Sequence, residues 1–233
     1  MKLNKIVKIT ATLKCESGLH IGGSETIMHI GGTDNYVIKN PVSGHPYIPG
    51  SSLKGKLRFL LEWRSGEVKG TPLSYNDYAS SKSPAVKKII QLFGVSADAN
   101  LTKEMAEEIG TARLSFWDCN IDPEWIEKMK KNSLLLTEIK TENVINRITG
   151  TAEHPRQIER VVAGTPFAFN LSLKVFDKDN EQDLINEIFS ALKLLELDSL
   201  GGSGSRGYGK VKFEKVCVDG VDKQTAFDNA KPF

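Results

Sequence analysis

Residues 201–209, Gly-Gly-Ser-Gly-Ser-Arg-Gly-Tyr-Gly, join a predicted helix to a predicted strand. This order decides which kind of glycine loop they form. The apolar spacing of residues 184–195 predicts the helix, and Val211, Phe213 and Val216 predict the strand. Nucleotide-binding glycine loops have the opposite order, in which a strand ends and a helix begins with its N-terminus facing the phosphate. We therefore expect no nucleotide cofactor at this loop.

The loop at residues 201–209 is unusually rich in glycine. Five of its nine residues are glycine, and a residue without a Cβ lets the backbone approach another group closely. A flexible connector is the ordinary interpretation, but a connector seldom needs so many glycines around one arginine, Arg206. A phosphate-rich ligand other than a mononucleotide is the hypothesis that follows.

The composition is that of a protein with a sizeable core. The chain has 233 residues, of which 39% are hydrophobic, enough for one large domain or a core with insertions. The N-terminus alternates Lys with Ile or Val, and no apolar run has the length of a membrane span, so we expect a cytoplasmic location and no membrane contact. The cysteines and histidines are not at zinc-ligand spacing, so we expect reduced thiols and no zinc.

The charge is unevenly distributed along the chain. A net charge of +2 is too small by itself to indicate a nucleic-acid binder. No acidic residue occurs between Asp34 and Glu62, whereas residues 103–127 are rich in Asp and Glu. The acidic stretch is typical of a solvated or partner-facing surface.

The order of the predicted elements indicates an α+β fold. Strands are expected at 5–15, 36–39, 112–119, 134–140, 167–176 and 211–216, and helices from Ser51 or Ser52 and at 85–93, 102–109, 123–131 and 184–197. Residues 66–84, rich in Gly, Ser, Pro and Tyr, indicate a mobile surface insertion. Strand, helix and strands followed by strand, helix and strand is the order of a split βαβ, or ferredoxin-like, sheet. We predict one domain over residues 1–233, with insertions at about 66–110.

Residues 141–164 form a long segment with neither helical nor strand periodicity. Arg147, Arg156 and Arg160 are set there among Thr, Asn and Gly. Segments of this length without structure of their own are uncommon inside compact domains. We therefore predict a protruding hairpin, or arm.

Residues 50–58, Gly-Ser-Ser-Leu-Lys-Gly-Lys-Leu-Arg, combine a helix N-terminus with hydroxyl groups and cations. Such a combination binds phosphate, and the i, i+4 spacing puts Lys54 and Arg58 on one helical face. An ordinary capped helix with a solvated face is the alternative, but the flanking glycines and the absence of acidic neighbours favour phosphate. Because a second cationic, glycine-rich element surrounds Arg206, a polymer of phosphates explains more than one mononucleotide does.

RNA-recognition modules with this sheet topology usually read bases through aromatic residues on their strands, and that signature is absent here. The phosphate backbone is therefore the expected contact. Tyr36, Tyr47 and Tyr208 lie near the glycine-rich segments and could stack on bases, or else anchor loops and the core.

Three motifs occur in a recognisable order: Gly-Leu-His-Ile-Gly-Gly at residues 18–23, Pro-Tyr-Ile-Pro-Gly-Ser-Ser-Leu-Lys-Gly-Lys-Leu-Arg at 46–58 and Ser-Arg-Gly-Tyr-Gly at 205–209. The arm adds Glu-Asn at 142–143 and continues to Ala-Gly-Thr at 163–165. Together these motifs resemble the RAMP superfamily of CRISPR proteins and, within it, the repeated backbone subunit of the type III-A (Csm) effector. The resemblance runs from about residue 5 to about residue 216.

The resemblance implies an RRM-like palm with a thumb hairpin. It also implies several copies along a guide RNA that cut the paired target RNA at regular intervals, together with other effector subunits. The family's catalytic aspartate matches Asp34, which we expect to act as a ligand of Mg²⁺ or another divalent cation, or as the base for a ribose 2′-hydroxyl. The residues expected to bind RNA are His20, Ser51, Ser52, Lys54, Lys56, Arg58, Asn143, Arg147, Arg156, Arg160, Gly202, Ser205, Arg206 and Tyr208.

Two other functions remain open at this point. A non-catalytic RNA-binding scaffold would not need Asp34, which by composition alone is also an ordinary turn residue. A stand-alone nuclease that processes guide precursors would need an acid or base such as His20.

Overall fold

A computed structural model describes residues 1–23, 35–95, 102 and 107–233 of the chain. The strands are β1 (Leu3–Cys15), β2 (Tyr47–Ile48), β3 (Leu114–Phe116), β4 (Cys119–Asn120), β5 (Thr137–Ile145), β6 (Ala152–Val161), β7 (Pro166–Phe176), β8 (Val211–Val218) and β9 (Val221–Asp222). The helices are α1 (Gly50–Ser65), α2 (Tyr75–Ser81), α3 (Pro84–Phe93), α5 (Pro123–Lys131), α6 (Glu181–Leu197) and α7 (Gln224–Asp228), with the 3-10 turn η1 (Gly204–Arg206). This arrangement confirms the expected mixture of helices and strands.

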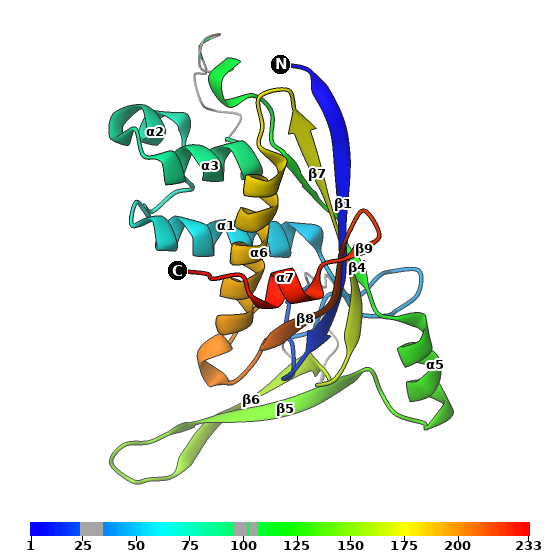
Figure 1. Ribbon diagram of the computed structural model, residues 1–233. Helices are drawn as coiled ribbons and strands as arrows, with labels where there is room; N and C mark the ends of the chain where they lie inside the picture. The colour runs from blue at the N-terminus through cyan, green and yellow to red at the C-terminus, as the bar shows by residue number, and fades with distance from the viewer. Residues whose placement is uncertain (24–34, 96–101, 103–106) are drawn as a thin grey trace.

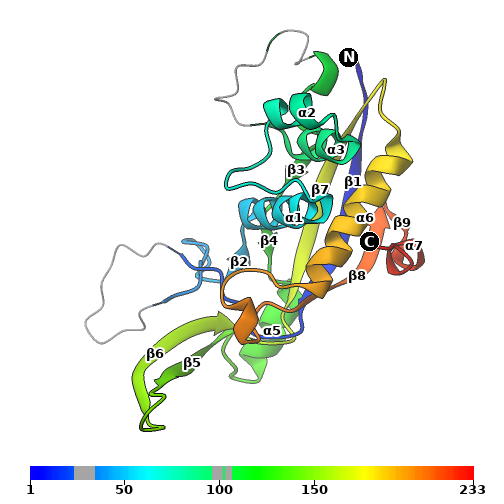
Figure 2. The ribbon, with the colours of Figure 1, turned by 90° about the vertical axis from the view of Figure 1, so that its left-hand side faces the viewer.

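The core lies between a sheet and a layer of helices on one of its faces. The antiparallel five-stranded sheet has the order β3-β7-β1-β8-β9, and β1 pairs along most of its length with β7. Side chains alternate between the faces of a strand, so Val7, Ile9 and Leu13 of β1 are buried beneath the helices. Helices α1, α3 and α6 cover this face, and α5 lies apart from them, near the base of the arm (Figures 1 and 2).

The C-terminal helix α7 closes the helical layer against β8. The Phe227 ring meets Phe189 of α6 at 5.5 Å and Phe213 of β8 at 6.1 Å between centroids, both edge to face. Such pairs stabilise a core beyond the area that they bury. Within the described residues, no helix is long and apolar enough to cross a membrane.

Strands β5 and β6 form a hairpin that extends away from the sheet and helices (Figure 1). Pairing runs from Thr137–Val161 at the base to Ile145–Ala152 near the tip. The hairpin is the element that the sequence predicted as a protruding arm, although its first strand starts at Thr137 within the region assigned to a separate strand at 134–140. We call this hairpin the arm.

The insertion after α1 is more ordered than its composition indicates, which corrects the prediction of a mobile segment at 66–84. Residues 75–81 form α2, whose first turn has a reciprocal capping box between Ser74 and Asp77. The Tyr75 and Tyr78 rings are buried, and both hydroxyl groups donate to Glu108. Short helices rich in Tyr, Ser and Asn have weak intrinsic propensity, so these tertiary contacts stabilise α2.

Three predicted elements differ from the structure or lie partly outside the described residues. The strand expected at 36–39 is replaced by isolated bridges, including Gly22 with Val37 and Lys39 with Pro46. Helix α1 begins at Gly50 rather than at a serine. Half of the helix expected at 102–109, residues 103–106, falls outside the described residues, and residues 107–109 are helical.

Candidate nucleic-acid interface

The glycine loop packs against the segment that follows β1. The Gly202 N–H donates to the His20 carbonyl at 2.9 Å, and the Gly209 N–H donates to the Gly18 carbonyl at 2.9 Å. A Cβ on Gly201 would overlap the His20 carbonyl oxygen, and a Cβ on Gly209 would overlap the Leu200 carbonyl oxygen. At these positions the glycines therefore admit the protein's own backbone, and binding of a phosphate-rich ligand by this loop stays a prediction.

The base of the arm also packs against the segment that follows β1. Leu19 and Val161 exchange backbone hydrogen bonds of 3.1 and 2.8 Å, and the Arg160 side chain lies against Gly18, where a Cβ would overlap it. Segment 18–23, the base of the arm and the glycine loop thus form one continuous surface, although they are far apart in the sequence. We call it the junction surface.

His20 is held at the centre of the junction surface. Its Nδ1 lies 2.6 Å from the Glu159 carbonyl oxygen, and because a carbonyl can only accept, Nδ1 carries the proton. In this tautomer, Nε2 carries the lone pair and can accept a hydrogen bond. The half-buried ring is flanked by Gly22 and Gly202.

Glu159 fixes the backbone at residues 35–39 to the arm. Its carboxylate accepts from the Val37 N–H at 3.0 Å and from Lys39 Nζ at 2.7 Å, and its own N–H donates to the Asn35 carbonyl. Burial alone would raise the pKa of this carboxyl, but hydrogen bonds from Lys39, Thr137 and Val37 outweigh burial and hold it below the ordinary value of 4.5. Glu159 is therefore ionised at neutral pH.

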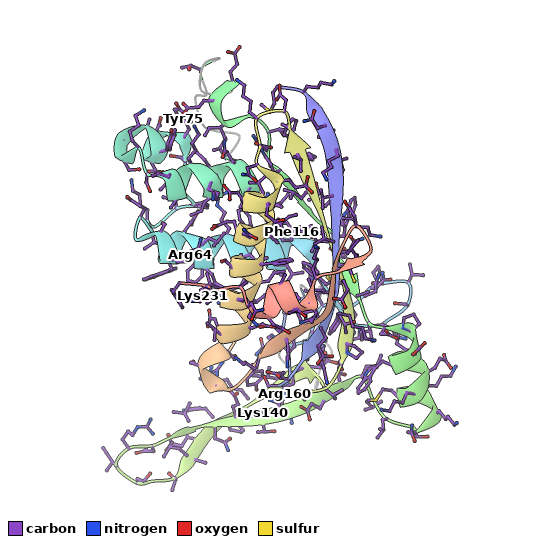
Figure 3. All side chains as sticks on the ribbon, viewed as in Figure 1. Arg64, Tyr75, Phe116, Lys140, Arg160 and Lys231 are labelled. Carbon is purple, nitrogen blue, oxygen red and sulfur yellow. The ribbon has the colours of Figure 1, made fainter. Side chains whose placement is uncertain are left out.

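Tyr208 lies beneath the junction surface and is only 1% exposed. Lys140 Nζ and the Arg160 guanidinium lie 4.6 and 4.9 Å from its ring centroid, and both residues stand at the base of the arm (Figure 3). Burial, and after it the Glu142 carboxylate, raise the pKa of Tyr208 to about 12. The ring supports two cations and is too buried to stack on a base, which corrects its expected role as an RNA contact.

A pocket of about 310 Å³ opens where the arm faces the glycine loop. It brings together three of the predicted RNA-binding residues, Asn143, Arg156 and Arg206. Glu142 and Val144 complete the lining. The predicted Gly202 and Ser205 are exposed on the same loop, so this part of the junction surface can receive an anionic chain.

The N-terminus of α1 is less available to phosphate than its sequence indicates. The Gly50 N–H already donates to Asp118 Oδ1 at 2.8 Å, and a Cβ on Gly50 would meet the Phe116 carbonyl. Lys56 pairs with Asp198 at 2.7 Å. Lys54 and Ser51 are exposed and Ser52 is half-buried, so these three side chains remain accessible to a phosphate group.

Arg58 points into the protein rather than along the exposed face of α1. Its Nε donates to Glu62 at 2.8 Å, and its terminal nitrogens donate to the Gly94 and Leu73 carbonyls at 3.0 and 2.6 Å. The side chain of Arg58 is 14% exposed. These contacts give Arg58 a structural role, which corrects its assignment to the RNA-binding set.

Two other predicted site residues are not part of the junction surface that the structure describes. Arg147 is at the exposed tip of the arm, where its guanidinium donates to the Ile145 carbonyl. Asp34 falls outside the described residues. Within those residues, no group of three or more His, Cys, Asp or Glu side chains is arranged to hold a metal ion.

Sequence reasoning missed the acids that organise the junction surface. Glu142 and Glu159 lie in the polar arm, where no periodic pattern indicated which carboxylates turn toward the body. Asp118 belongs to the acidic stretch that was interpreted as solvated or partner-facing; it is exposed, and it also accepts the Gly50 N–H at the start of α1. Alternation along β5 could have placed Lys140 and Glu142 on one face, but the register with β6 was not readable from the sequence.

Comparison with known proteins places this geometry in a family. Residues 12–212 match the RAMP superfamily. The chain is 42% identical to the CRISPR system Cms endoribonuclease Csm3 of Streptococcus thermophilus, over 90% of this chain and 88% of that protein. The chain belongs to the RAMP superfamily and, within it, to the Csm3 family. A second Csm3 endoribonuclease, from Methanothermobacter thermautotrophicus, is 37% identical over 94% of this chain and 87% of that protein.

Solved structures share the fold. A Csm3–Csm4 subcomplex of a type III-A CRISPR-Cas interference complex contains a chain that is 27% identical, with a TM-score of 0.55 over 94% of this chain and 80% of that chain. Csm3 of Methanopyrus kandleri gives a TM-score of 0.58 at 23% identity, over 93% of this chain and 78% of that chain. This second likeness concerns the fold alone.

Proposed function

We propose that this chain is a guide-RNA-binding backbone subunit of an RNA-guided effector complex, and an endoribonuclease that cuts the RNA paired with the guide. The observation that carries the proposal is the junction surface, in which segment 18–23, the arm and the glycine loop, all distant in sequence, meet around Arg156, Arg206 and His20. Its relatives in the Csm3 family carry the name endoribonuclease. Further copies of the chain and other effector subunits are the proposed protein partners, supported by the Csm3–Csm4 likeness.

The architecture supports a ferredoxin-like palm with a thumb. The strands β3, β7, β1 and β8 are neighbours in this order, with α1 following β1 and α6 following β7, which is the arrangement of the split βαβ fold. The arm corresponds to the thumb. Because the arm is mostly exposed and pairs with itself, it is free to meet a neighbouring copy and to separate guide from target.

RNA binds in this proposal through its phosphates. Arg156, Arg206 and Lys54 supply cations, while Asn143, Ser51, Ser52 and Ser205 supply neutral donors at exposed or half-buried positions. Contacts of this kind fix the position of the backbone without reading bases. The sequence of the target is then determined by pairing with the guide.

Cleavage is assigned to Asp34 in this proposal. As a base, Asp34 takes the proton of a ribose 2′-hydroxyl, whose oxygen attacks the adjacent phosphorus while the bond to the 5′-oxygen breaks and that oxygen gains a proton. The products are then a 2′,3′-cyclic phosphate and a 5′-hydroxyl. Binding Mg²⁺ or another divalent cation is the alternative role of Asp34, and phosphate oxygens of the RNA would have to supply most of the remaining ligands.

The test uses the assembled complex, a complementary RNA and Mg²⁺ on a denaturing gel. Wild-type complex should give a regular series of fragments, and Asp34→Ala should leave the RNA intact while still binding it. Addition of a chelator should have the same effect as the substitution. Full cleavage by Asp34→Ala would remove Asp34 from the mechanism and favour His20, whereas a wild-type complex that binds without cutting would support the scaffold function.

A further inference from the structure

Glu142 is a carboxylate inside a pocket that is otherwise suited to anions. Its Oε2 lies 3.2 Å from Arg206 Nη1 of the glycine loop, and its Oε1 lies 3.7 Å from Lys140 Nζ. Arg156 stands directly opposite Glu142 in the register of β5 and β6. One acid therefore faces three cations, all at the place where the arm meets the glycine loop.

The carboxylate of Glu142 is incompletely satisfied in this position. Its Oε1 is buried and accepts no regular hydrogen bond from a described residue. Its neighbours are Lys140 Nζ at 3.7 Å and the Tyr208 hydroxyl, whose pKa the Glu142 carboxylate raises. The Glu142 side chain is 16% exposed, whereas that of its partner Arg206 is 52% exposed. A buried, under-bonded carboxylate destabilises a fold, so its presence calls for a role beyond packing.

We propose that Glu142 is an internal substitute for an RNA phosphate. It holds Arg206 in the free protein and releases Arg206 to a phosphate group when RNA enters the pocket. This inference rests on the proposed function, because it assumes that Arg206 contacts RNA. Glu142 thereby lowers the affinity of the junction surface for phosphate and keeps Arg206 oriented across the pocket until RNA arrives.

The exchange is chemically reasonable for this pair. The contact between Glu142 and Arg206 uses one carboxylate oxygen and one guanidinium nitrogen, whereas a guanidinium can bind phosphate through two parallel hydrogen bonds. The pocket of about 310 Å³ reaches the lower end of the range for small-ligand sites. A partly exposed ion pair contributes little net free energy, so RNA can replace it readily.

The test measures binding of a labelled single-stranded uridine homopolymer to the isolated full-length chain by fluorescence anisotropy, at several salt concentrations. Glu142→Gln should bind about two- to five-fold more tightly than wild type, the range expected for loss of one partly exposed competing ion pair. Glu153→Gln is the matched control, since this arm carboxylate bonds Asn146 rather than a cation, and its affinity should stay close to wild type. Glu142→Ala provides a second variant in case the glutamine form folds poorly.

A double-substitution cycle shows whether Glu142 acts through Arg206. Arg206→Gln should weaken binding, and adding Glu142→Gln to it should give little further change. Equal or weaker binding by folded Glu142→Gln would overturn the inference, as would the same tightening in the absence of Arg206. If instead wild type does not bind RNA, or Arg206→Gln does not weaken binding, the proposed RNA contact itself fails.

Discussion

At Arg58, an ion pair and two carbonyl contacts make a guanidinium part of the protein interior. Arg58→Ala leaves the buried Glu62 carboxylate without its counter-ion, so we expect the free energy of unfolding to fall by about 3 kcal/mol. Urea unfolding followed by circular dichroism measures this change. Lys54→Ala on the exposed side of the same helix is the control and should change stability by less than about 0.5 kcal/mol. Comparable effects of the two substitutions would contradict the structural role of Arg58.

The lowered pKa of Glu159 predicts that the stability of the protein depends on pH. Its folded-state pKa lies below the ordinary value of 4.5, so its contribution to stability is fully present above that value and is lost as the pH falls through the lowered pKa. Glu159→Gln removes the contribution at every pH. The stability difference between wild type and Glu159→Gln should therefore be constant from pH 7 to pH 5 and shrink below pH 4.5. A difference that stayed constant down to pH 3 would show that the charge of Glu159 is not responsible.

At the scale of elements, the arm is the part of the fold most separable from the core. Residues 144–153 at its tip pair with one another and are mostly exposed. Replacing them with a two-residue Asn-Gly turn should leave the melting temperature nearly unchanged, because no core contact is removed. The shortened protein should nonetheless disrupt assembly with neighbouring copies or alter the spacing of cuts. Electron microscopy and mapping of the cleavage products check this, and normal filaments with an unchanged series of products would contradict it.

Elements with strong periodicity were predictable from the sequence, and elements stabilised by distant contacts were not. The apolar spacing in α6 and the Pro-initiated start of α5 define those helices locally. Helix α2 depends on Glu108, and no local pattern links that residue to Tyr75 and Tyr78.

For the candidate site, too, local sequence patterns identified the segments, whereas the roles of individual residues depended on distant contacts. The motifs identified the right segments, because glycine spacing and arginine content are local properties. The roles of Arg58 and Tyr208 depended on which side of each element met the core. Distant partners decided both cases, the buried Glu62 for Arg58 and the partly exposed pair Lys140 and Arg160 for Tyr208.

At the scale of the whole molecule, the basic groups of the junction surface predict the salt dependence of binding. Each phosphate contact on a single strand contributes about 0.7 to the slope of log affinity against log salt. The double variant Arg156→Gln with Arg206→Gln should therefore lower the slope by about 1.4 and weaken all RNA sequences alike. Lys128→Gln on α5, away from the junction surface, is the control and should leave the slope unchanged. An unaltered slope in the double variant would mean that these arginines do not contact phosphate.

The central claim is that the junction surface holds the RNA backbone. The most direct measurement is photo-crosslinking of a guide RNA that carries 4-thiouridine at successive positions in the assembled complex, followed by mass spectrometry of the crosslinked peptides. We expect crosslinks in segment 18–23, at Asn143 and Arg156 of the arm and at residues 202–206 of the glycine loop. Crosslinks confined to the exposed face of α1 or to the sheet face without helices, with none in the junction surface, would contradict the account.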